Sequence, residues 1–510
     1  MKSVPLADLV QDPITRAVLA GQDLGAAADL QSAAALYRSR DVDRAPLAAS
    51  IEATMNASRS AGDDAWRRAL DDLARPGTLA VVTGQQIGAL GGPLYSVYKA
   101  LAASALAREL SGEGFGRVVP VFWMATQDHD LAEIDHAHVI DAHGDLMRLR
   151  FRCMSGGAPV GLLRVTRDMV AAFAQWTGAM HPTASSSLLE LLAPCEGESW
   201  PTWFARCMRA CLPGTDVLYF DPLTHARPTT PLLAKALTES VRVRAALDAG
   251  IARLAGKSLR ASLASDAASL VFDHRDGRRE RLRVDDAAVV KHGRRTSLAS
   301  TLAAVASAPA AFSGNVALRP VLQGALLPCI AYVGGPAEIA YYQQLPELFR
   351  FFDVPFPAIV PRFSATVLTP RARELLRRLA VTDVQAIAEP ARLTPHLAAD
   401  GSAASAREQV TRLLDRYAAN LPAMNRSVAR ARRTLERVLD RLARQARLLA
   451  PGERRLARGD ALTNLIRPNG KLQERVLSAA TFVVEYGATP LVSDLARQDP
   501  RLARHYVIDL

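Results

Sequence analysis

A short apolar run followed by a glycine-rich loop constrains the fold of this 510-residue chain more than any other segment. Residues 79–82, Leu-Ala-Val-Val, are typical of a short buried strand. Four glycines follow between Gly84 and Gly92, and a helical pattern begins at Pro93. Glycine lets the backbone approach a ligand closely, and proline suits the first helical position. This order predicts a cradle for phosphate or carboxylate, held by backbone N–H groups and the helix dipole.

A second apolar run, Val118 to Met124, predicts another strand, with a helix over residues 93–110 between the two. A strand, a helix and a strand in succession indicate a parallel sheet with a right-handed crossover. Ligands of such sheets bind beyond the carboxyl ends of the strands, where polar residues follow both runs. We therefore predict an α/β fold. Further strands are expected at 217–220, 329–333 and 358–360, a hairpin at 270–284, and helices at 337–349 and 471–477.

Composition narrows the functional class. The formal net charge is +11, which favours acidic small molecules, nucleic acid or anionic surfaces as partners. Five cysteines fit a reducing cytosol better than a disulfide framework. The first residues resemble no signal peptide, and no apolar stretch is long enough to span a membrane. We expect a cytoplasmic globular protein.

A seven-residue repeat sets residues 402–450 apart from the rest of the chain. Apolar residues recur at Leu414, Leu421, Val428, Leu435, Leu442 and Leu449, and Tyr417, Met424, Ala431 and Val438 occupy the positions three residues later. Such a repeat predicts a left-handed coiled coil. It could pair between two chains or fold back within one. The arginine-rich surface around it indicates a solvated basic face, with nucleic-acid binding as the alternative.

Two clusters of polar residues are candidates for chemistry. In the first, Asp128 and Asp130 flank His129 directly after the second predicted strand. A neighbouring carboxylate tunes a histidine, so we hypothesise that His129 is a general base for an incoming amine. A metal site built with the nearby Glu133, Asp135, His136 and His138 is conceivable, but their spacing matches no standard zinc motif, and we assign none.

The second cluster repeats the logic of the glycine loop. The predicted strand 329–333 runs into Gly334, Gly335 and a proline that opens a helix. Arg319 could supply a bidentate charge for carboxylate or phosphate, and Arg362 is a second anion candidate. Glu338, in the first helical turn, is either a partner of the helix dipole or an acceptor for a substrate ammonium.

Taken together, five motifs resemble the bacillithiol biosynthesis cysteine-adding enzyme family in order and spacing, over roughly residues 79–510. The motifs are TGQQIGALGGPLYSVYKA, PVFWMATQDHDLAEIDH, LRPVLQGALLPCIAYVGGPAEIAYYQQL, VPRFS and RPNGKLQERVL. The resemblance implies a Rossmann-like parallel-sheet core with connecting insertions and a coiled-coil arm used for dimerisation. It also implies a ligase that adds cysteine to the amino group of glucosaminyl-malate to form bacillithiol. Because a carboxylate is a poor electrophile, we expect ATP to activate the cysteine.

The resemblance also implies the site. The matching residues are Thr83, Gly84, Gln85, Gln86, Gly92 and Lys99 in the first motif, Asp128, His129 and Asp130 in the second, Arg319, Gln323, Gly334, Gly335 and Glu338 in the third, Arg362 in the fourth, and Asn469, Gln473, Glu474 and Arg475 in the last. Two positions depart from the family pattern. Gln127 stands where the family usually has Glu, and Gly324 where it usually has Asp, so two site carboxylates are expected to be missing.

The expected organisation has six segments. They are an N-terminal helical segment (1–75), the first half of the core (76–150), a connecting region (151–310), the second half of the core (311–370), the coiled-coil arm (371–460) and a C-terminal segment that returns to the core (461–510). Two other functions remain open. One is a basic coiled-coil protein that binds nucleic acid and carries a degenerate nucleotide site, and the other is a nucleotidyltransferase acting on another small molecule.

Overall fold

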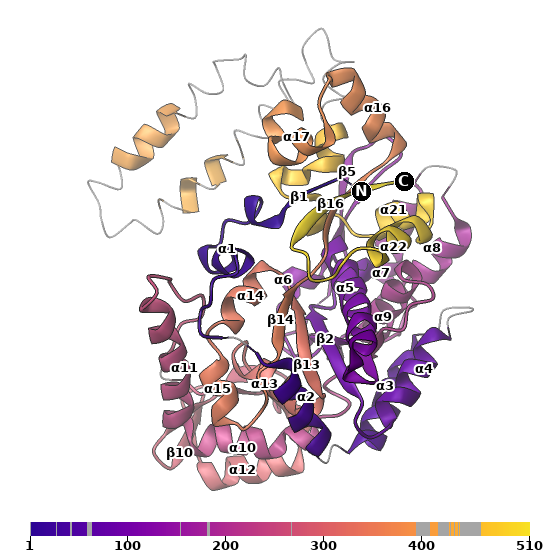
Figure 1. Ribbon diagram of the computed structural model, residues 1–510. Coiled ribbons are helices and arrows are strands. Elements are labelled where there is room, and N and C mark those ends of the chain that lie inside the picture. Colours follow the sequence, from indigo (N-terminus) through magenta and orange to yellow (C-terminus); the bar gives the residue numbers. More distant parts are fainter. Residues whose placement is uncertain are drawn as a thin grey trace. The chain divides into compact units, whose positions relative to one another are not determined.

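The computed structural model describes residues 2–26, 28–40, 43–58, 64–153, 155–180, 184–266, 268–393, 408–416, 428, 430–432, 434–436, 438 and 461–510 (Figure 1). These residues form two compact units. The first comprises Met1–Ala142, Met147–Val367 and Glu474–Leu510, and the second comprises His143–Leu146 and Leu368–Gln473. The sheet and most of the residues of the five motifs belong to the first unit.

A five-stranded parallel sheet forms the centre of the first unit, in the order β14-β13-β2-β3-β6 (Figure 1). Its strands are β2 (Leu79–Gln85), β3 (Val118–Met124), β6 (Leu218–Phe220), β13 (Cys329–Gly334) and β14 (Ala358–Pro361). Every residue of β3 and β13 is buried. Such continuous apolar runs are typical of parallel strands covered on both faces. The prediction of a parallel α/β sheet is therefore confirmed.

Helix α5 (Leu94–Leu110) connects β2 to β3 and packs across both strands. It is buried along nearly its whole length, which its many alanines permit because they let neighbouring elements approach closely. Pro93 precedes this helix as its N-cap instead of occupying the predicted first helical position. The N–H of Leu94 donates to the carbonyl of Leu477 at 2.8 Å, so the chain itself occupies this end of the helix.

The N-terminal helical segment is also observed. Its helices are α1 (Pro13–Leu19), α2 (Leu30–Ser39), α3 (Arg44–Ala57) and α4 (Ala65–Ala74). Helix α2 packs on β2 and β13, and α3 packs on β6. The short strand β1 (Ser3–Pro5) pairs antiparallel with the C-terminal strand β16 (Arg504–Asp509), which also neighbours β15 (Ser364–Leu368). The two ends of the chain therefore meet in one small sheet.

Most of the remaining elements lie between β3 and α13 (Leu318–Leu326). They are α6 (Leu131–Ile134), β4 (His136–Ile140), β5 (Leu146–Arg150), α7 (Arg167–Thr177), α8 (Ser186–Leu192), α9 (Trp200–Cys211), α10 (Thr230–Thr238), α11 (Ser240–Ala255), β7 (Val271–Asp273), β8 (Glu280–Arg281), β9 (Arg283–Asp285), β10 (Ala288–Lys291), β11 (Arg294–Ser297), α12 (Leu298–Ser307) and β12 (Phe312–Gly314). The predicted hairpin is present as β7 and β8, which pair antiparallel. This hairpin brings its turn residues to the functional site described below.

Two predicted helices differ from the structure. The helix expected over residues 337–349 is divided into α14 (Pro336–Tyr342) and α15 (Pro346–Phe351), because Pro346 begins a new helix after a turn. Residues 471–477 do not form the predicted α-helix: the segment contains only the short 3₁₀ turn Gln473–Arg475. Just before it, Asn469 and Gly470 have φ angles of 53° and 73°, which fits the predicted turn. The remaining helices of this part are α13 (Leu318–Leu326), α21 (Ala480–Tyr486) and α22 (Thr489–Ala496), which packs on α5.

The second unit is helical where it is described. It contains α16 (Pro370–Leu379), α17 (Asp383–Ala388) and helical residues at 408–416 and 461–466. The predicted coiled coil falls mostly outside the described residues, including Leu421, Leu442, Leu449, Tyr417 and Met424. The coiled coil therefore stays a prediction. Within the described parts of the chain, none of the helices is long and apolar enough to cross a membrane.

Candidate active site

A cavity of about 680 Å³ lies in the first unit at the carboxyl ends of the sheet strands. It is where the rule for parallel sheets places a ligand. Its walls come from the ends of β2, β3 and β13, from α5 and α14, from the β7–β8 hairpin and from the segment after β12. Its lining residues include Gly84, Gln85, Gln86, Tyr95, Lys99, Gln127, Asp128, Glu133, Phe272, Arg279, Arg281, Arg319, Gly335, Glu338, Tyr341, Arg362 and Arg475.

The carboxyl end of β2 leads directly into this cavity. Gly84 sits beside β3 so closely that a Cβ there would lie 3.1 Å from the carbonyl oxygen of Trp123. The close approach of the two strands therefore favours glycine at this position. Gln85 and Gln86 follow at the cavity wall. Thr83 is buried within the sheet, where its hydroxyl donates to the carbonyl of Val333 at 2.8 Å and joins β2 to β13.

Lys99 is almost fully buried, with 2 % of its side chain exposed. Its Nζ donates to the carbonyl of Gly84 and to Oε1 of Gln85, both at 2.7 Å, and it forms an ion pair with Glu338. All three donors of the ammonium therefore have acceptors inside the protein. Lys99 therefore stabilises the end of β2. To bind a substrate phosphate or carboxylate, Lys99 would have to give up one of these three partners.

Glu338 connects three parts of the site. Its carboxylate accepts from the hydroxyl of Tyr332 at 2.5 Å and from the N–H of Gly335 at 2.8 Å, in addition to its ion pair with Lys99. Burial opposes its ionisation, but Lys99 and these hydrogen bonds outweigh burial, so the pKa of Glu338 lies below its usual range. The side chain keeps 17 % of its surface exposed towards the cavity that it lines.

Arg319, on α13, is held in place by its own neighbours. Its guanidinium donates to the amide oxygen of Gln323 at 3.1 Å and to the hydroxyl of Tyr341 at 2.6 Å. Gln323 is buried, and its Nε2 lies 3.7 Å from Sγ of Cys329. Gln323 therefore orients Arg319. It is not one of the described residues that line the cavity. Tyr341 also lines the cavity, beside the arginine.

Asp128 is the member of the Asp-His-Asp motif that lines the cavity. Its Oδ2 accepts from Nε2 of Gln86 at 2.6 Å, and its Oδ1 accepts from Nη1 of Arg279 at 3.1 Å. Burial acts to raise the pKa of Asp128, but the Arg279 charge and the hydrogen bonds from Gln86 and from the backbone N–H of His129 lower it below the usual value. The first and second motifs thus meet directly through Gln86 and Asp128.

His129 and Asp130 lie beside this group. Nδ1 of His129 is 3.3 Å from Oδ1 of Asp128 and 3.1 Å from Nη1 of Arg279. Its ring packs against Phe272, with the ring centroids 6.2 Å apart. Asp130 caps helix α6 by accepting from the N–H of Ala132 at 3.0 Å. Asp130 is thus engaged at a helix terminus, whereas Asp128 contacts the histidine.

Arg279 and Glu133 are site residues that sequence reasoning did not assign. Arg279 comes from the β7–β8 hairpin and also donates to the hydroxyl of Ser313 and the carbonyl of Gly314. Glu133, on α6, lies at the cavity edge. Partial desolvation and the charges of Asp130 and Asp128 raise its pKa, although Lys99 acts in the opposite direction. The turn signal at Asp276-Gly277 pointed to the hairpin, but nothing in the sequence pointed to its role.

The fourth and fifth motifs meet in a buried ion pair. Nη2 of Arg362 donates to Glu474 at 2.6 Å, and Glu474 also accepts from the Ser364 hydroxyl at 3.0 Å and the Ala365 N–H at 3.1 Å. The Arg362 guanidinium stacks on Tyr95 at 5.4 Å. Glu474 thus anchors Arg362, and its neighbour Arg475 reaches the cavity wall.

Gly92, Gly334, Asn469 and Gln473 are further candidate residues that do not belong to the described cavity wall. Gly92, with a φ of 73°, packs against Ser96. The carbonyl of Gly334 accepts from the N–H of Arg362 at 2.9 Å. Asn469 and Gln473 belong to the second unit, where Nε2 of Gln473 donates to the carbonyl of Leu465 at 2.6 Å. Gly335 does line the cavity.

The two departures from the family pattern have different consequences. Gln127 lines the cavity, so an amide stands at a position where a carboxylate was expected. Gly324 does not belong to the described cavity wall: a Cβ there would lie 2.8 Å from Cγ1 of Val354 and 3.1 Å from the hydroxyl of Tyr37. The Tyr37 hydroxyl donates to the Gly324 carbonyl at 2.9 Å. Glycine at 324 thus accommodates packing on α13, and the loss of a site carboxylate at this position stays a prediction.

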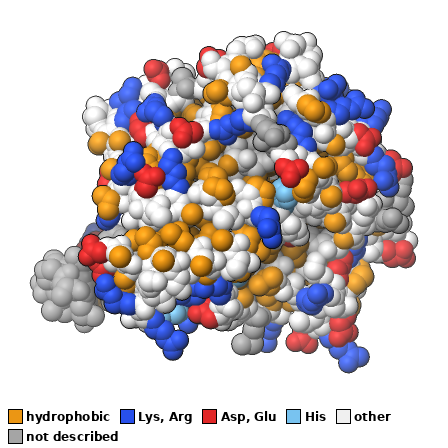
Figure 2. All heavy atoms as spheres, turned by 90° about the horizontal axis from the view of Figure 1, so that it is seen from below, with side chains coloured by type: hydrophobic (Ala, Val, Ile, Leu, Met, Phe, Trp, Pro, Cys, Tyr) orange, Lys and Arg blue, Asp and Glu red, His pale blue; other side chains and the backbone are white. Residues whose placement is uncertain are grey.

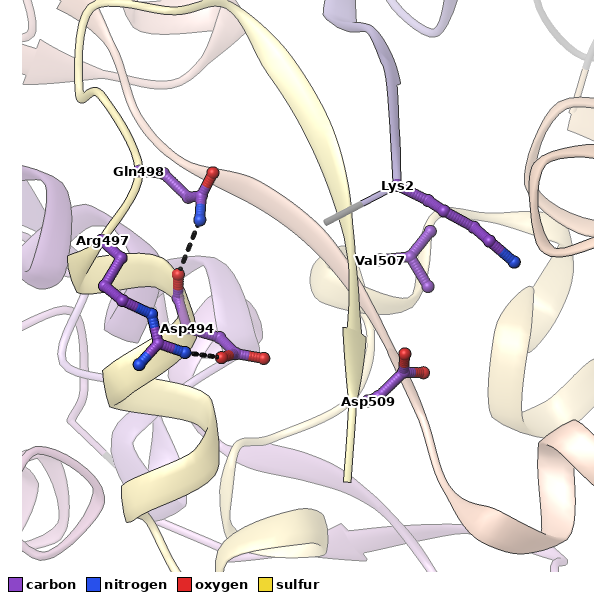
Figure 3. A pocket seen from close by; sticks show the side chains of 6 residues that line it. All are labelled: Lys2, Asp494, Arg497, Gln498, Val507 and Asp509. Atoms are coloured by element: carbon purple, nitrogen blue, oxygen red, sulfur yellow. Dashed lines mark hydrogen bonds and ion pairs between the residues drawn. The ribbon is translucent and has the colours of Figure 1, made fainter.

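Over the described part of the chain, no group of three or more His, Cys, Asp or Glu side chains is arranged to hold a metal ion. A hollow of about 250 Å³ lies beside β16 and α22, lined by Lys2, Asp494, Arg497, Gln498, Val507 and Asp509 (Figure 3). In it Arg497 is paired with Asp494, and Gln498 donates to the Asp494 backbone carbonyl at 3.0 Å (Figure 3). The motifs converge on the larger cavity, which is the candidate active site.

The fold and the cavity define a Rossmann-like α/β protein with a polar small-molecule site at the sheet edge. Residues 23–363 match the family model described as bacillithiol biosynthesis BshC, N-terminal Rossmann-like domain. The chain belongs to this family.

Relatives of similar length carry the name cysteine ligase BshC. The protein of Solibacter usitatus is 34 % identical over 438 residues, covering 82 % of each chain. That of Koribacter versatilis is 32 % identical over 85 % of this chain and 84 % of its own. That of Geobacillus kaustophilus is 29 % identical over 86 % of both chains.

Proposed function

We propose that this protein is a ligase that joins the carboxyl group of cysteine to the amino group of glucosaminyl-malate, completing bacillithiol. One observation carries the proposal: residues from all five motifs meet around a single cavity, with Gln86 on Asp128, Lys99 on Glu338 and Arg362 on Glu474. The names of the relatives agree with a cysteine ligase. Residues this far apart in the chain converge on one place because they serve one site.

The charges of the cavity complement these substrates. Cysteine offers an ammonium and a carboxylate, and glucosaminyl-malate offers an amine and two malyl carboxylates. The cavity wall carries the guanidinium groups of Arg279, Arg281, Arg319 and Arg475 and the carboxylates of Asp128, Glu133 and Glu338. Arginine recognises carboxylate and phosphate through paired N–H donors. In our proposal Arg319 receives a substrate carboxylate, and Glu338 receives the cysteine ammonium.

The amide bond needs an activated cysteine carboxyl, and we propose ATP as the activator. The acyl carbon would carry a phosphate or an adenylate, which leaves as the amine attacks. Because Leu477 already accepts the N–H of Leu94, arginines of the cavity wall are better placed to hold the phosphates than the start of α5. Arg281 and Arg475 are our candidates for this role.

We propose that the proton of the attacking amine is accepted at the end of the cavity that carries acidic side chains. The amine loses a proton as it forms the amide, so a base must stand near it. Asp128 and Glu133 line this end of the cavity, and His129 lies beside Asp128. Partial desolvation and the charges of Asp130 and Asp128 raise the pKa of Glu133, which makes Glu133 our candidate for the base.

The test is mass spectrometry of the purified full chain incubated with glucosaminyl-malate, cysteine and ATP, with each component omitted in turn. The expected product is heavier than the sugar substrate by one cysteinyl residue and requires all three components. An Arg319→Ala variant, which loses the proposed carboxylate contact, should form less product at limiting substrate. Absence of product from the complete mixture would refute the proposal, and product without ATP would refute the activator.

The two alternatives make different predictions. A nucleotidyltransferase would release pyrophosphate and leave the nucleotide on its product, which the same spectra would reveal. A nucleic-acid-binding protein would show affinity that falls linearly in log[salt] and would not depend on Asp128. On the face shown in Figure 2, basic side chains are interspersed with acidic and apolar ones and form no continuous basic surface. This distribution favours a small-molecule site.

We further propose a homodimer formed through the coiled coil and a cytoplasmic location. The seven-residue repeat supports the first and the sparse cysteines support the second. Sedimentation analysis of the full chain, compared with a variant carrying Leu435→Asp, tests the dimer. Both species sedimenting as monomers would refute it.

A further inference from the structure

The contacts of Arg279 determine which nitrogen of His129 carries its proton. The guanidinium is 7 % exposed and lies over the ring of Phe272, 3.9 Å from its centroid. Nε donates to the hydroxyl of Ser313 at 3.1 Å, and Nη2 donates to the carbonyl of Gly314 at 3.0 Å. These contacts fix the plane of the group and leave Nη1 facing the Asp-His pair.

Nη1 has two N–H bonds and two neighbours. It lies 3.1 Å from Oδ1 of Asp128 and 3.1 Å from Nδ1 of His129. An arginine nitrogen is a donor only, so each neighbour must accept. If Nδ1 carried a proton, two donor N–H groups, that of His129 and that of the Arg279 cation, would face each other. Nδ1 is therefore the unprotonated nitrogen of the ring.

The carboxylate does not need a proton from the imidazole. Oδ1 of Asp128 already accepts from the backbone N–H of His129 at 2.8 Å and from Arg279, and Oδ2 accepts from Gln86 at 2.6 Å. The alternative hydrogen bond, from Nδ1–H of His129 to Oδ1, would span 3.3 Å. That distance is longer than the usual range, whereas the contact with Arg279 lies within it.

We propose that Arg279 is a positioning residue that holds His129 with its proton on Nε2, so that the imidazole acts as a hydrogen-bond donor to the substrate and not as the base. The bond made by one ring nitrogen decides the state of the other. The ring is 43 % exposed beside the cavity residues Asp128, Arg279 and Phe272 and so is accessible to a ligand.

This inference deepens the proposed function and rests on it for its chemical meaning. When the amine attacks the activated cysteine, the acyl oxygen gains negative charge. A fixed N–H donor stabilises such an oxygen. The proton of the amine then leaves to a carboxylate of the same end of the cavity, for which Glu133 is placed. In this proposal Glu133, and not His129, is the base.

The tautomer can be read without substrate, by two-bond ¹H–¹⁵N correlation NMR of the full chain labelled at histidine. The His129 signals are identified by their loss in His129→Gln. We expect Nδ1 to show the shift of an unprotonated nitrogen and Nε2 that of a protonated one. The reverse pattern in the wild-type protein would overturn the proposal.

Variants of Arg279 test the cause. Arg279→Met keeps an apolar stem over Phe272 but removes every donor, so the proton should move to Nδ1, opposite Asp128. The matched control is Arg278→Met: Arg278 is the preceding residue, is 65 % exposed and should leave the wild-type pattern unchanged. An unchanged tautomer in folded Arg279→Met would refute the role of Arg279. If that variant does not fold, the wild-type spectrum still decides the tautomer, and Arg279→Lys, which keeps a cationic donor, should retain it.

The activity assay distinguishes this inference from the proposed function. Arg279→Met should lower kcat by about 10²–10³-fold, the usual loss for an oxyanion donor, with a smaller change in KM for cysteine. If the wild-type protein forms no product at all, the ligase proposal fails while the tautomer result stands. If it forms product and the tautomer is reversed, only the inference fails.

Discussion

Lys99 and Glu338 form a buried ion pair that joins α5 to α14 at the edge of the cavity. The ammonium also holds Gly84 and Gln85, and the carboxylate also holds Tyr332 and Gly335. The pair therefore connects the glycine loop after β2 to the glycine turn after β13. Two motifs that look alike in the sequence are in this way parts of one structure.

Removing one partner of this pair should destabilise the fold. We expect Lys99→Met to lower the free energy of unfolding by about 3–5 kcal/mol, because Glu338 then keeps a buried charge without its counterion. The double variant Lys99→Met with Glu338→Gln should recover part of the loss. Urea unfolding of the four proteins gives the coupling energy. Additive effects of the two substitutions would show that the pair has no energetic role.

The same carboxylate should make stability depend on pH. The pKa of Glu338 is lower in the folded protein than in the unfolded chain. Its contribution is therefore present above the unfolded value, about 4.3, and is lost as the pH falls through the lower folded value. Unfolding free energies measured from neutral to acidic pH should fall more steeply in the wild type than in Glu338→Gln. If the free energies of unfolding of the two proteins changed in parallel with pH, the pKa of Glu338 would not be lowered by folding.

The sequence predicted the sheet well because its strands are buried on both faces. Continuous apolar runs at 79–82, 118–124 and 329–333 mark β2, β3 and β13 to within three residues. The carboxyl-end rule placed the polar residues after β2 and β3 at one edge of the sheet, where Gln86 and Asp128 are hydrogen-bonded. Such patterns can be recognised in a single sequence because each lies within one contiguous segment of the chain.

Long-range partners could not be predicted in the same way. Arg279 reaches Asp128 across a separation of 151 residues, through a hairpin that looked like an insertion. The acceptors of the Lys99 ammonium, Gly84 and Glu338, could not be predicted either, because nothing beside Lys99 in the sequence reveals them. Residues 471–477 have helical composition, but Glu474 is instead held by Arg362, Ser364 and Ala365. Tertiary contacts override the local preference there.

Restoring the family's aspartate at position 324 should harm the protein. A side chain there meets Val354 and Tyr37, so Gly324→Asp should cost about 1–3 kcal/mol from overpacking alone and should bury a charge as well. We expect a lower melting temperature and no gain in ligase activity. Gly324→Ala is the control for packing without charge. Higher activity in Gly324→Asp would show that this position does reach the site.

Arg319 should determine substrate binding more than the chemical step. Arg319→Lys loses the planar group that contacts Gln323 and Tyr341, so the cation is no longer oriented. A charged hydrogen bond contributes about 1.5–3 kcal/mol, which predicts a rise of about 10–100-fold in the KM of the carboxylate-bearing substrate. Steady-state kinetics with Arg278→Lys as the matched control measures it. A fall in kcat at constant KM would place Arg319 in the chemical step instead.

Glu133 should set the acidic limb of the pH–rate profile. Partial desolvation and the charges of Asp130 and Asp128 raise its pKa. As the pH falls through that value the carboxylate becomes protonated and can no longer accept the proton of the amine, so kcat should fall. Glu133→Gln should lose about 10²–10⁴-fold in kcat together with this limb.

Asp130→Asn provides the sharper test of the same assignment. It removes one of the charges that raise the pKa of Glu133, so the acidic limb should move to lower pH while the limb itself persists. Because Asp130 also caps the short helix α6, the variant should be compared with Asp130→Ser, which keeps a capping oxygen without the charge. Both variants should shift the limb alike if charge is the cause. A limb that stays in place in both, or that survives in Glu133→Gln, would assign the base to another group of this cavity.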